Sequence, residues 1–137
     1  MKSFFDTSAL AKRYIHETGT ESVNILFARS ENVLVSIICL PEIFSALNRL
    51  RRQKAVAKSH YAQIKRTILK EFEGFSICAV TPHVISRSLQ LLERYELRAM
   101  DAIHLACAQE MKAQIFVSAD IRQTSIARKM KFEIVQV

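Results

Sequence analysis

The segment "KSFFDTSALAKRY", residues 2–14, joins a short apolar run directly to a helix-like stretch. Two phenylalanines precede Asp6, and Thr7 and Ser8 follow it. A strand that passes at once into a helix is the repeating unit of α/β proteins, and ligands bind beyond the carboxyl ends of strands in their open sheets. Asp6 therefore lies where a carboxylate could take part in chemistry as well as in local structure.

The same alternation continues along the chain. Five short runs have the length and the β-branched or aromatic content of strands: 2–6, 32–36, 75–80, 114–118 and 132–137. Seven helical patterns lie between them: 7–16, 21–30, 41–52, 56–73, 83–95, 100–112 and 121–129. This order predicts an α/β fold with a parallel sheet covered on both faces, formed by residues 1–137 as a single domain.

The composition is that of a folded protein. Half of the residues are apolar and the chain has 2 Gly and 2 Pro, which excludes disordered and fibrous classes. No apolar stretch approaches the roughly 20 residues of a membrane span, and no signal peptide pattern opens the chain. Cys39, Cys78 and Cys107 are widely spaced in apolar sequence, as expected for core residues in a reducing compartment. We expect a cytoplasmic protein without a membrane partner.

Four acids occupy junctions between predicted elements. Asp6 and Asp120 follow strands, Glu42 follows Pro41 in the first turn of a helix, and Asp101 opens another helix. Each has a purely structural explanation, because Asp6 and Asp120 could be helix N-caps and the other two could complement a helix dipole, an effect of about 0.3–1 kcal/mol. A doubly wound sheet could nevertheless bring all four to one edge.

Together the four acids indicate a metal site. Two carboxylates about 4 Å apart repel by roughly 4 kcal/mol at an effective dielectric near 20, so four gathered carboxylates require a cation or shifted pKa values. Hard oxygen ligands without Cys or His favour Mg²⁺ or Mn²⁺ over zinc. Such a metal lowers the pKa of bound water and neutralises charge on a phosphoryl oxygen.

Basic residues are in excess over the rest of the chain. Setting the four acids aside leaves 13 − 4 = 9 acidic residues against 20 basic ones. The densest basic group is Arg49, Arg51, Arg52, Lys54, Lys58, Lys65 and Arg66. It either contacts a nucleic-acid backbone or forms an ordinary solvated helical face. An acidic pocket with a basic rim is the pattern expected of a phosphodiester-cleaving metalloenzyme.

Three segments together resemble PIN-domain ribonucleases, especially the VapC-like toxins of type II toxin–antitoxin systems. "FFDTSALAKRYIHETGTES" resembles the opening of that family, and "VSIICLPEIFSAL" resembles its second acidic motif. "LRAMDAIHLACAQEMKAQIFVSAD" resembles its third and fourth motifs. The resemblance spans essentially the whole chain, in the family's order and spacing.

The resemblance implies roles for individual residues. The family's metal-binding acids fall on Asp6, Glu42, Asp101 and Asp120. Thr7 or Ser8 matches a hydroxyl that helps to order the site, and Ser118 matches the family's usual Thr or Ser. We infer that a metal-activated water attacks the phosphorus in line, with Asp120 acting through water or a second metal. Arg49, Arg51, Arg52 and Lys54 are the candidate RNA contacts.

The resemblance also implies the assembly around this site. It predicts a three-layer α/β/α sandwich, Mg²⁺- or Mn²⁺-dependent cleavage of RNA, a homodimer and a small antitoxin bound in or beside the site. Leu10, Tyr14 and Leu47 are hypothesised to line the antitoxin groove.

Two interpretations remain beside the toxin, and two others are disfavoured. A catalytically silent RNA- or antitoxin-binding module would share the fold, and PIN nucleases also process RNA. A haloacid-dehalogenase-like phosphatase is disfavoured because it would need an acid where Ser8 lies, and a receiver domain would need paired acids at the first strand. His104, three residues after Asp101, could contact the site, but we interpret it as a packed or hydrogen-bonded core residue.

Overall fold

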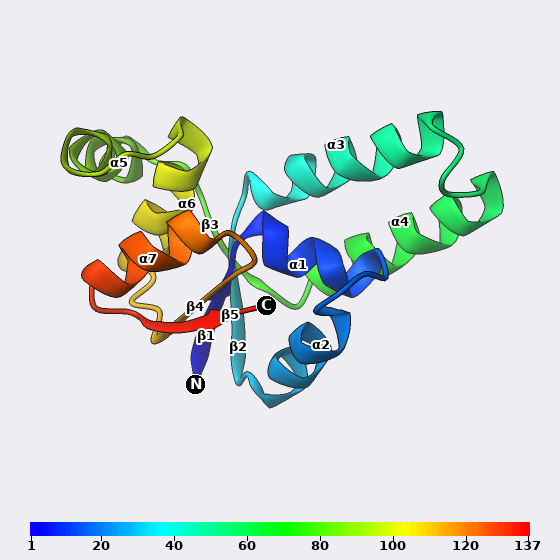
Figure 1. Ribbon diagram of the computed structural model, residues 1–137, viewed down its shortest axis with the longest axis horizontal. Helices are drawn as coiled ribbons and strands as arrows, with labels where there is room; N and C mark the ends of the chain where they lie inside the picture. The colour runs from blue at the N-terminus through cyan, green and yellow to red at the C-terminus, as the bar shows by residue number, and fades with distance from the viewer.

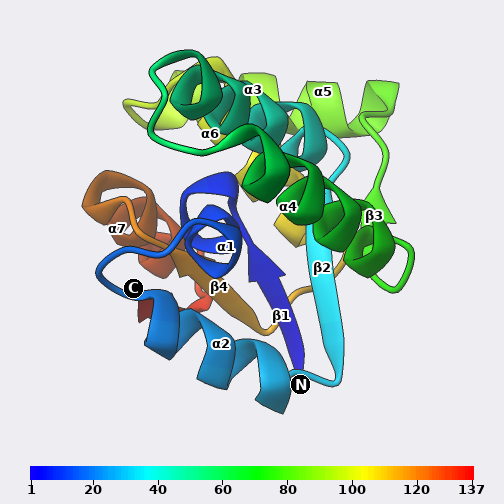
Figure 2. The same ribbon diagram turned by 90° about the vertical axis from the view of Figure 1, so that its right-hand side faces the viewer.

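A computed structural model describes residues 1–137 as one five-stranded sheet with seven helices (Figures 1 and 2). The strands are β1 (Lys2–Phe5), β2 (Asn32–Ser36), β3 (Ser76–Cys78), β4 (Ile115–Ser118) and β5 (Glu133–Gln136). The helices are α1 (Thr7–Tyr14), α2 (Thr20–Arg29), α3 (Cys39–Arg52), α4 (Lys58–Phe72), α5 (Pro82–Arg94), α6 (Ala99–Glu110) and α7 (Ile121–Lys129).

All neighbouring strands run parallel, in the order β3-β2-β1-β4-β5. The first strand of the chain is therefore the middle strand of the sheet, and Phe5 of β1 lies opposite Val117 of β4. Parallel neighbours require crossover connections, which the helices supply. Every predicted strand and helix is present, although the strand expected over 75–80 is shorter and forms an edge of the sheet.

Two hydrophobic clusters fill the two faces of the sheet. Phe4 belongs to the cluster beneath α5, α6 and α7, whereas Phe5 belongs to the cluster beneath α1, α2, α3 and α4. Successive residues of a strand point to opposite faces, so this one pair of phenylalanines anchors both layers. Figure 1 shows the two groups of helices on either side of the sheet. The predicted three-layer sandwich is confirmed.

Helices α3 and α4 form a hairpin that projects from the sheet (Figure 1). The amino end of α3 lies just after β2, and the basic residues Arg49, Arg51 and Arg52 lie in its last turn. Lys54 follows in the connection to α4, with a positive φ of 59°. The basic cluster is thus at the far end of the hairpin from the sheet.

Two predictions from composition also have outcomes. Cys39, Cys78 and Cys107 are free and buried, as expected for core residues. None of the helices combines the length and the apolar character that a membrane span would need.

Candidate active site

Asp6 ends the central strand and caps the helix that follows it. Its backbone is extended, and its Oδ1 accepts hydrogen bonds from the Ala9 backbone N–H at 3.0 Å and from the Ser8 hydroxyl at 2.7 Å. The residue is only 2% exposed. The N-cap explanation of Asp6 is therefore correct, and the capping geometry fixes its carboxylate at the carboxyl edge of the sheet.

Two serines connect this carboxylate to the end of the neighbouring strand. The Ser118 hydroxyl at the end of β4 donates to Asp6 Oδ2 at 2.5 Å and accepts from the Asp120 backbone N–H at 3.0 Å. The Ser8 hydroxyl accepts in turn from the Ala119 backbone N–H at 3.0 Å. Each serine thus joins Asp6 to the connection between β4 and α7, which brings Asp6 and Asp120 to the same edge.

Glu42 is held to the same edge by residues from two other helices. Its Oε1 accepts from the Thr7 hydroxyl at 2.5 Å and lies 2.6 Å from His104 Nε2. Thr7 opens α1, Glu42 lies in the first turn of α3, and His104 lies one turn into α6. Ser8 therefore orders Asp6, while Thr7 orders Glu42.

The remaining two acids lie on the solvent side of the edge. Asp101 is half-buried in the first turn of α6, and its carboxylate accepts no hydrogen bond. Asp120 is exposed and caps α7, with Oδ1 accepting from the Arg122 backbone N–H at 2.9 Å. The buried Gln123 side chain donates to the Asp101 backbone carbonyl at 3.3 Å and so ties the start of α7 to the start of α6.

The electrostatics of these groups reflect their crowding. Burial raises the pKa of Asp6 above its ordinary value, although hydrogen bonds from Ser118 and Ser8 oppose the shift. Burial and then the negative charge of Asp120 raise the pKa of Asp101, and Glu42 adds to the effect. Burial acts in the same direction on Glu42, but the hydrogen bonds from His104 and Thr7 outweigh it and lower its pKa.

The four acids share one edge but do not converge on one point. No three His, Cys, Asp or Glu side chains are grouped so that they could hold a metal ion together. Both oxygens of Asp6 and one of Glu42 accept hydrogen bonds instead. Their role as metal ligands stays a prediction.

Other predicted residues lie away from the acids. The basic residues Arg49, Arg51, Arg52 and Lys54 are exposed at the end of the α3–α4 hairpin. The hypothesis that Leu10 and Leu47 line a surface groove is wrong, because both are fully buried in the core beneath α1 and α3. Tyr14 does border a hollow of about 240 Å³ between α1 and α4.

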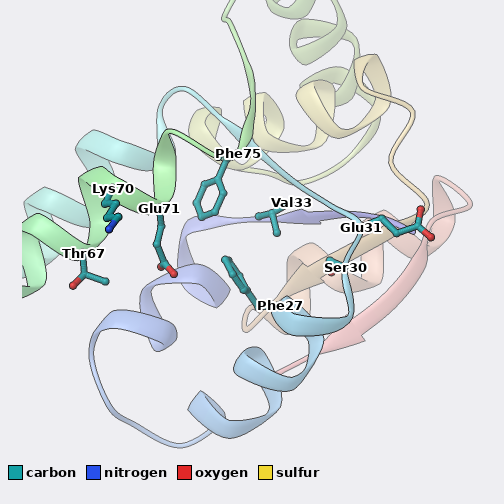
Figure 3. Close-up of a pocket in the computed structure, with 9 residues that line it drawn as sticks. Phe27, Ser30, Glu31, Val33, Thr67, Lys70, Glu71 and Phe75 are labelled. Carbon is teal, nitrogen blue, oxygen red and sulfur yellow. The ribbon is translucent and has the colours of Figure 1, made fainter.

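A cavity of about 600 Å³ lies between α2, α4 and the amino end of β2 (Figure 3). It is bordered by Phe27 at the end of α2, Val33 at the start of β2, and Phe75 after α4. The acids lie beyond the carboxyl ends of the strands, whereas this cavity adjoins the amino end of β2. It is therefore separate from the edge of the sheet where Asp6, Glu42, Asp101 and Asp120 lie, which we call the acidic edge.

The sequence predicted only a core role for His104 and did not single out Gln123, although both help to order the site. His104 is 2% exposed, as expected for a core residue, but it also contacts Glu42. Its position three residues after Asp101, on the same face of the helix, was the available signal. No local pattern distinguished Gln123, whose partner is a backbone carbonyl on another helix.

The fold and the site together define an α/β protein with acidic residues beyond the carboxyl ends of its central strands. The sequence model of the PIN domain matches residues 3–129, and the chain belongs to the PIN-domain family. Among known proteins, it is similar to the ribonucleases VapC45 and VapC49 from two strains of Mycobacterium tuberculosis. Each is 29% identical over 105 residues, which cover 77% of this chain and 73% of the relative.

Solved structures show the same fold. FitAcB from Neisseria gonorrhoeae superposes with a TM-score of 0.75 at 15% identity, covering 98% of this chain and 96% of that one. VapC20 of Mycobacterium tuberculosis gives a TM-score of 0.71 at 19% identity, with coverages of 90% and 94%. A toxin–antitoxin complex from Klebsiella pneumoniae gives 0.70 at 21% identity, with coverages of 98% and 96%. The predicted family and fold are confirmed.

Proposed function

We propose that this chain is a VapC-type toxin: a single-domain endoribonuclease that uses Mg²⁺ or Mn²⁺ to cleave RNA phosphodiester bonds. Its relatives VapC45 and VapC49 are named ribonucleases, and the chain belongs to the PIN-domain family. The observation that carries the proposal is the gathering of four acids at the carboxyl edge of the sheet, in a protein whose charge is otherwise strongly positive.

The donor chemistry of this edge fits a hard divalent cation. Its free ligand atoms are carboxylate oxygens. Burial and then repulsion from Asp120 raise the pKa of Asp101, and a cation would relieve that repulsion. The residues that would hold the ion are Asp6, Glu42, Asp101 and Asp120, whose carboxylates would have to move closer together to do so. When bound, Mg²⁺ or Mn²⁺ supplies positive charge for a phosphate oxygen and lowers the pKa of a bound water.

The protein's own part in the reaction is to hold these carboxylates in place. Ser8, Ser118 and the Ala9 backbone fix both oxygens of Asp6 before any ligand arrives. Asp101 and Asp120 keep oxygens without hydrogen bonds on the solvent side, where a phosphate would approach. Fixing Asp6 in this way reduces the rearrangement that is needed when the ion and the RNA bind.

RNA would be bound through its backbone by Arg49, Arg51, Arg52 and Lys54. All four side chains are exposed at the end of the α3–α4 hairpin. Arg51 is partly ordered, because its guanidinium lies over the Tyr61 ring, 4.8 Å from the centroid, and donates to Asn48 Oδ1 at 2.9 Å. Contacts of this kind give affinity that depends on salt and not on sequence.

We propose that the chain forms a homodimer and binds an antitoxin. Ile85 and Leu89 are four residues apart on α5 and are 38% and 56% exposed, which leaves an apolar stripe suited to a partner. For the antitoxin, Tyr14 and the hollow between α1 and α4 remain candidates. Relatives crystallised as a toxin–antitoxin complex and as VapBC2 with promoter DNA support such a partner.

The test is cleavage of total RNA with and without Mg²⁺, comparing wild type with Asp6→Asn. We expect Mg²⁺-dependent fragments from the wild type and none from Asp6→Asn. Ser88→Ala is the control, since it alters a buried polar side chain away from the acids, on α5, where the hydroxyl bonds only the Ile85 carbonyl. Undiminished cleavage by Asp6→Asn would remove the acidic edge from the reaction. RNA binding without cleavage by the wild type would favour the silent binding module.

A further inference from the structure

His104 occupies a position in the core that packing alone does not explain. The residue is 2% exposed, and its ring meets Phe4 edge-on, with centroids 6.2 Å apart. Nε2 lies 2.6 Å from Glu42 Oε1, but Nδ1 is buried without any hydrogen-bond partner. One side of the ring is therefore bonded to the acidic edge, and the other side is unpaired in apolar surroundings.

An unpaired buried polar atom lowers stability, at a cost of about 1–3 kcal/mol. Most of the neighbouring buried positions on α6 are apolar, including Ala102, Leu105 and Ala108. A leucine at position 104 would fill similar space without burying polar atoms. The fold itself thus gains little from an imidazole here, and the ring's contribution must come through the bond to Glu42.

The direction of that bond follows from its partners. A carboxylate oxygen accepts hydrogen bonds, so the short contact to Oε1 is made when Nε2 carries the proton and donates it. The Thr7 hydroxyl donates to the same oxygen. Two donors from two helices thus converge on Oε1, and no hydrogen bond reaches Oε2. This pins one oxygen of the carboxylate and leaves the other free.

We propose that His104 is a positioning residue, whose Nε2–H holds Glu42 so that its free oxygen can bind the divalent cation of the acidic edge. The inference rests on the proposed function, because it assigns Glu42 to that cation. His104 itself touches neither metal nor RNA. Hydrogen-bond partners that orient a metal ligand typically change metal affinity or activity by 10–100-fold when they are removed.

The variants His104→Leu and His104→Gln separate this role from packing. Leucine removes both ring nitrogens at similar volume, whereas glutamine keeps an amide N–H that can reach Glu42. Ser88→Ala again serves as the control for loss of a buried polar group away from the edge. Each protein is measured for its Kd for Mn²⁺ by calorimetry, for its melting temperature without metal, and for RNA cleavage.

We expect His104→Leu to melt no lower than wild type while its Kd for Mn²⁺ rises about 10–100-fold. His104→Gln should restore most of the affinity, and Ser88→Ala should bind Mn²⁺ as wild type does. In a Glu42→Ala background, His104→Leu should have no further effect on the Kd, because the two residues act through one bond. This rise in Kd without loss of stability is a signature that a merely structural residue would not give.

A Kd for Mn²⁺ within twofold of wild type in His104→Leu overturns the inference, as does a further loss in the Glu42→Ala background. If the leucine variant does not fold, His104→Gln and His104→Asn decide the question. The shorter asparagine cannot reach Glu42, so equal Mn²⁺ affinities in that pair refute the role.

The two proposals fail in different ways. Mn²⁺ binding by a wild type that does not cleave RNA overturns the proposed function, while the calorimetry still tests His104. A wild type that binds no Mn²⁺ overturns both.

Discussion

Asp101→Asn exchanges a half-buried carboxylate for a neutral amide of nearly the same shape. Burial and the charges of Asp120 and Glu42 disfavour the ionised form of Asp101, so the ionised side chain lowers the stability of the metal-free protein. Repulsion between partly exposed like charges is on the order of 1 kcal/mol. We expect metal-free Asp101→Asn to be more stable than wild type by about that amount, which raises Tm by about 3–5 °C in a domain of this size.

Mg²⁺ should stabilise the wild type more than it stabilises the Asp101→Asn variant. A cation that binds only the folded state stabilises it by about 2.7 kcal/mol at a hundredfold excess over its Kd. For wild type this corresponds to a rise in Tm of about 10 °C. A tenfold weaker Kd at the same concentration removes about 1.4 kcal/mol, so the rise in the Asp101→Asn variant should be about half as large or less.

The assay is a thermal melt of both proteins with and without MgCl₂ at constant ionic strength, followed by RNA cleavage under the same conditions. Glu93→Gln is the matched control, because it removes an exposed carboxylate on α5, away from the acidic edge. The reasoning is refuted if metal-free Asp101→Asn melts below wild type, or if Mg²⁺ raises its Tm as much as it raises that of wild type.

Three further changes test other parts of the structure. Ser118→Ala should lower the free energy of unfolding by about 1–3 kcal/mol in urea titrations, because Asp6, Ser8 and the Asp120 backbone lose a fully buried hydroxyl partner; a change below about 0.5 kcal/mol contradicts this. Replacing Arg51 and Arg52 together by alanine should reduce the slope of log K against log salt for RNA binding by about 1–2, and an unaltered slope would exclude them from the contact. The Arg13 guanidinium overcomes the burial of Glu71 and lowers the pKa of that carboxyl below its ordinary 4.5, so the pair's stabilisation is full above that pH and fades as pH falls through the lowered pKa. Glu71→Gln should therefore lose about 1–3 kcal/mol at pH 7 and approach wild type in acid; a loss that is independent of pH would refute the ion pair.

The sequence was sufficient for the fold because periodicity and strand composition are local signals. The pair Phe4 and Phe5 anchors both layers of the sandwich. The order of the strands within the sheet had no local signal in the sequence and comes from the structure. Edge strand β3 was predicted too long, because a run of apolar residues does not show where hydrogen bonding to the single neighbouring strand ends.

The edge itself was predictable only in outline. The sequence correctly offered Asp6 and Asp120 as N-caps of the helices that follow two strands, because capping depends on neighbours in sequence. The bond between Glu42 and His104 depends on how α3 approaches α6, which no local pattern encodes. The groove hypothesis failed at Leu10 and Leu47 for the same reason, since only tertiary packing decides which apolar helix positions are covered.

The central place of β1 has a consequence for how the protein is made. Asp6 is synthesised 112 residues before its partner Ser118. At about 5–20 residues per second, translation between these two points takes roughly 6–20 s. During that interval the first strand has no β4 beside it, so the nascent chain cannot assemble the acidic edge. A ribosome therefore adds these 112 residues before any ribonuclease activity of that edge could begin, and the proposed antitoxin can be made during that time.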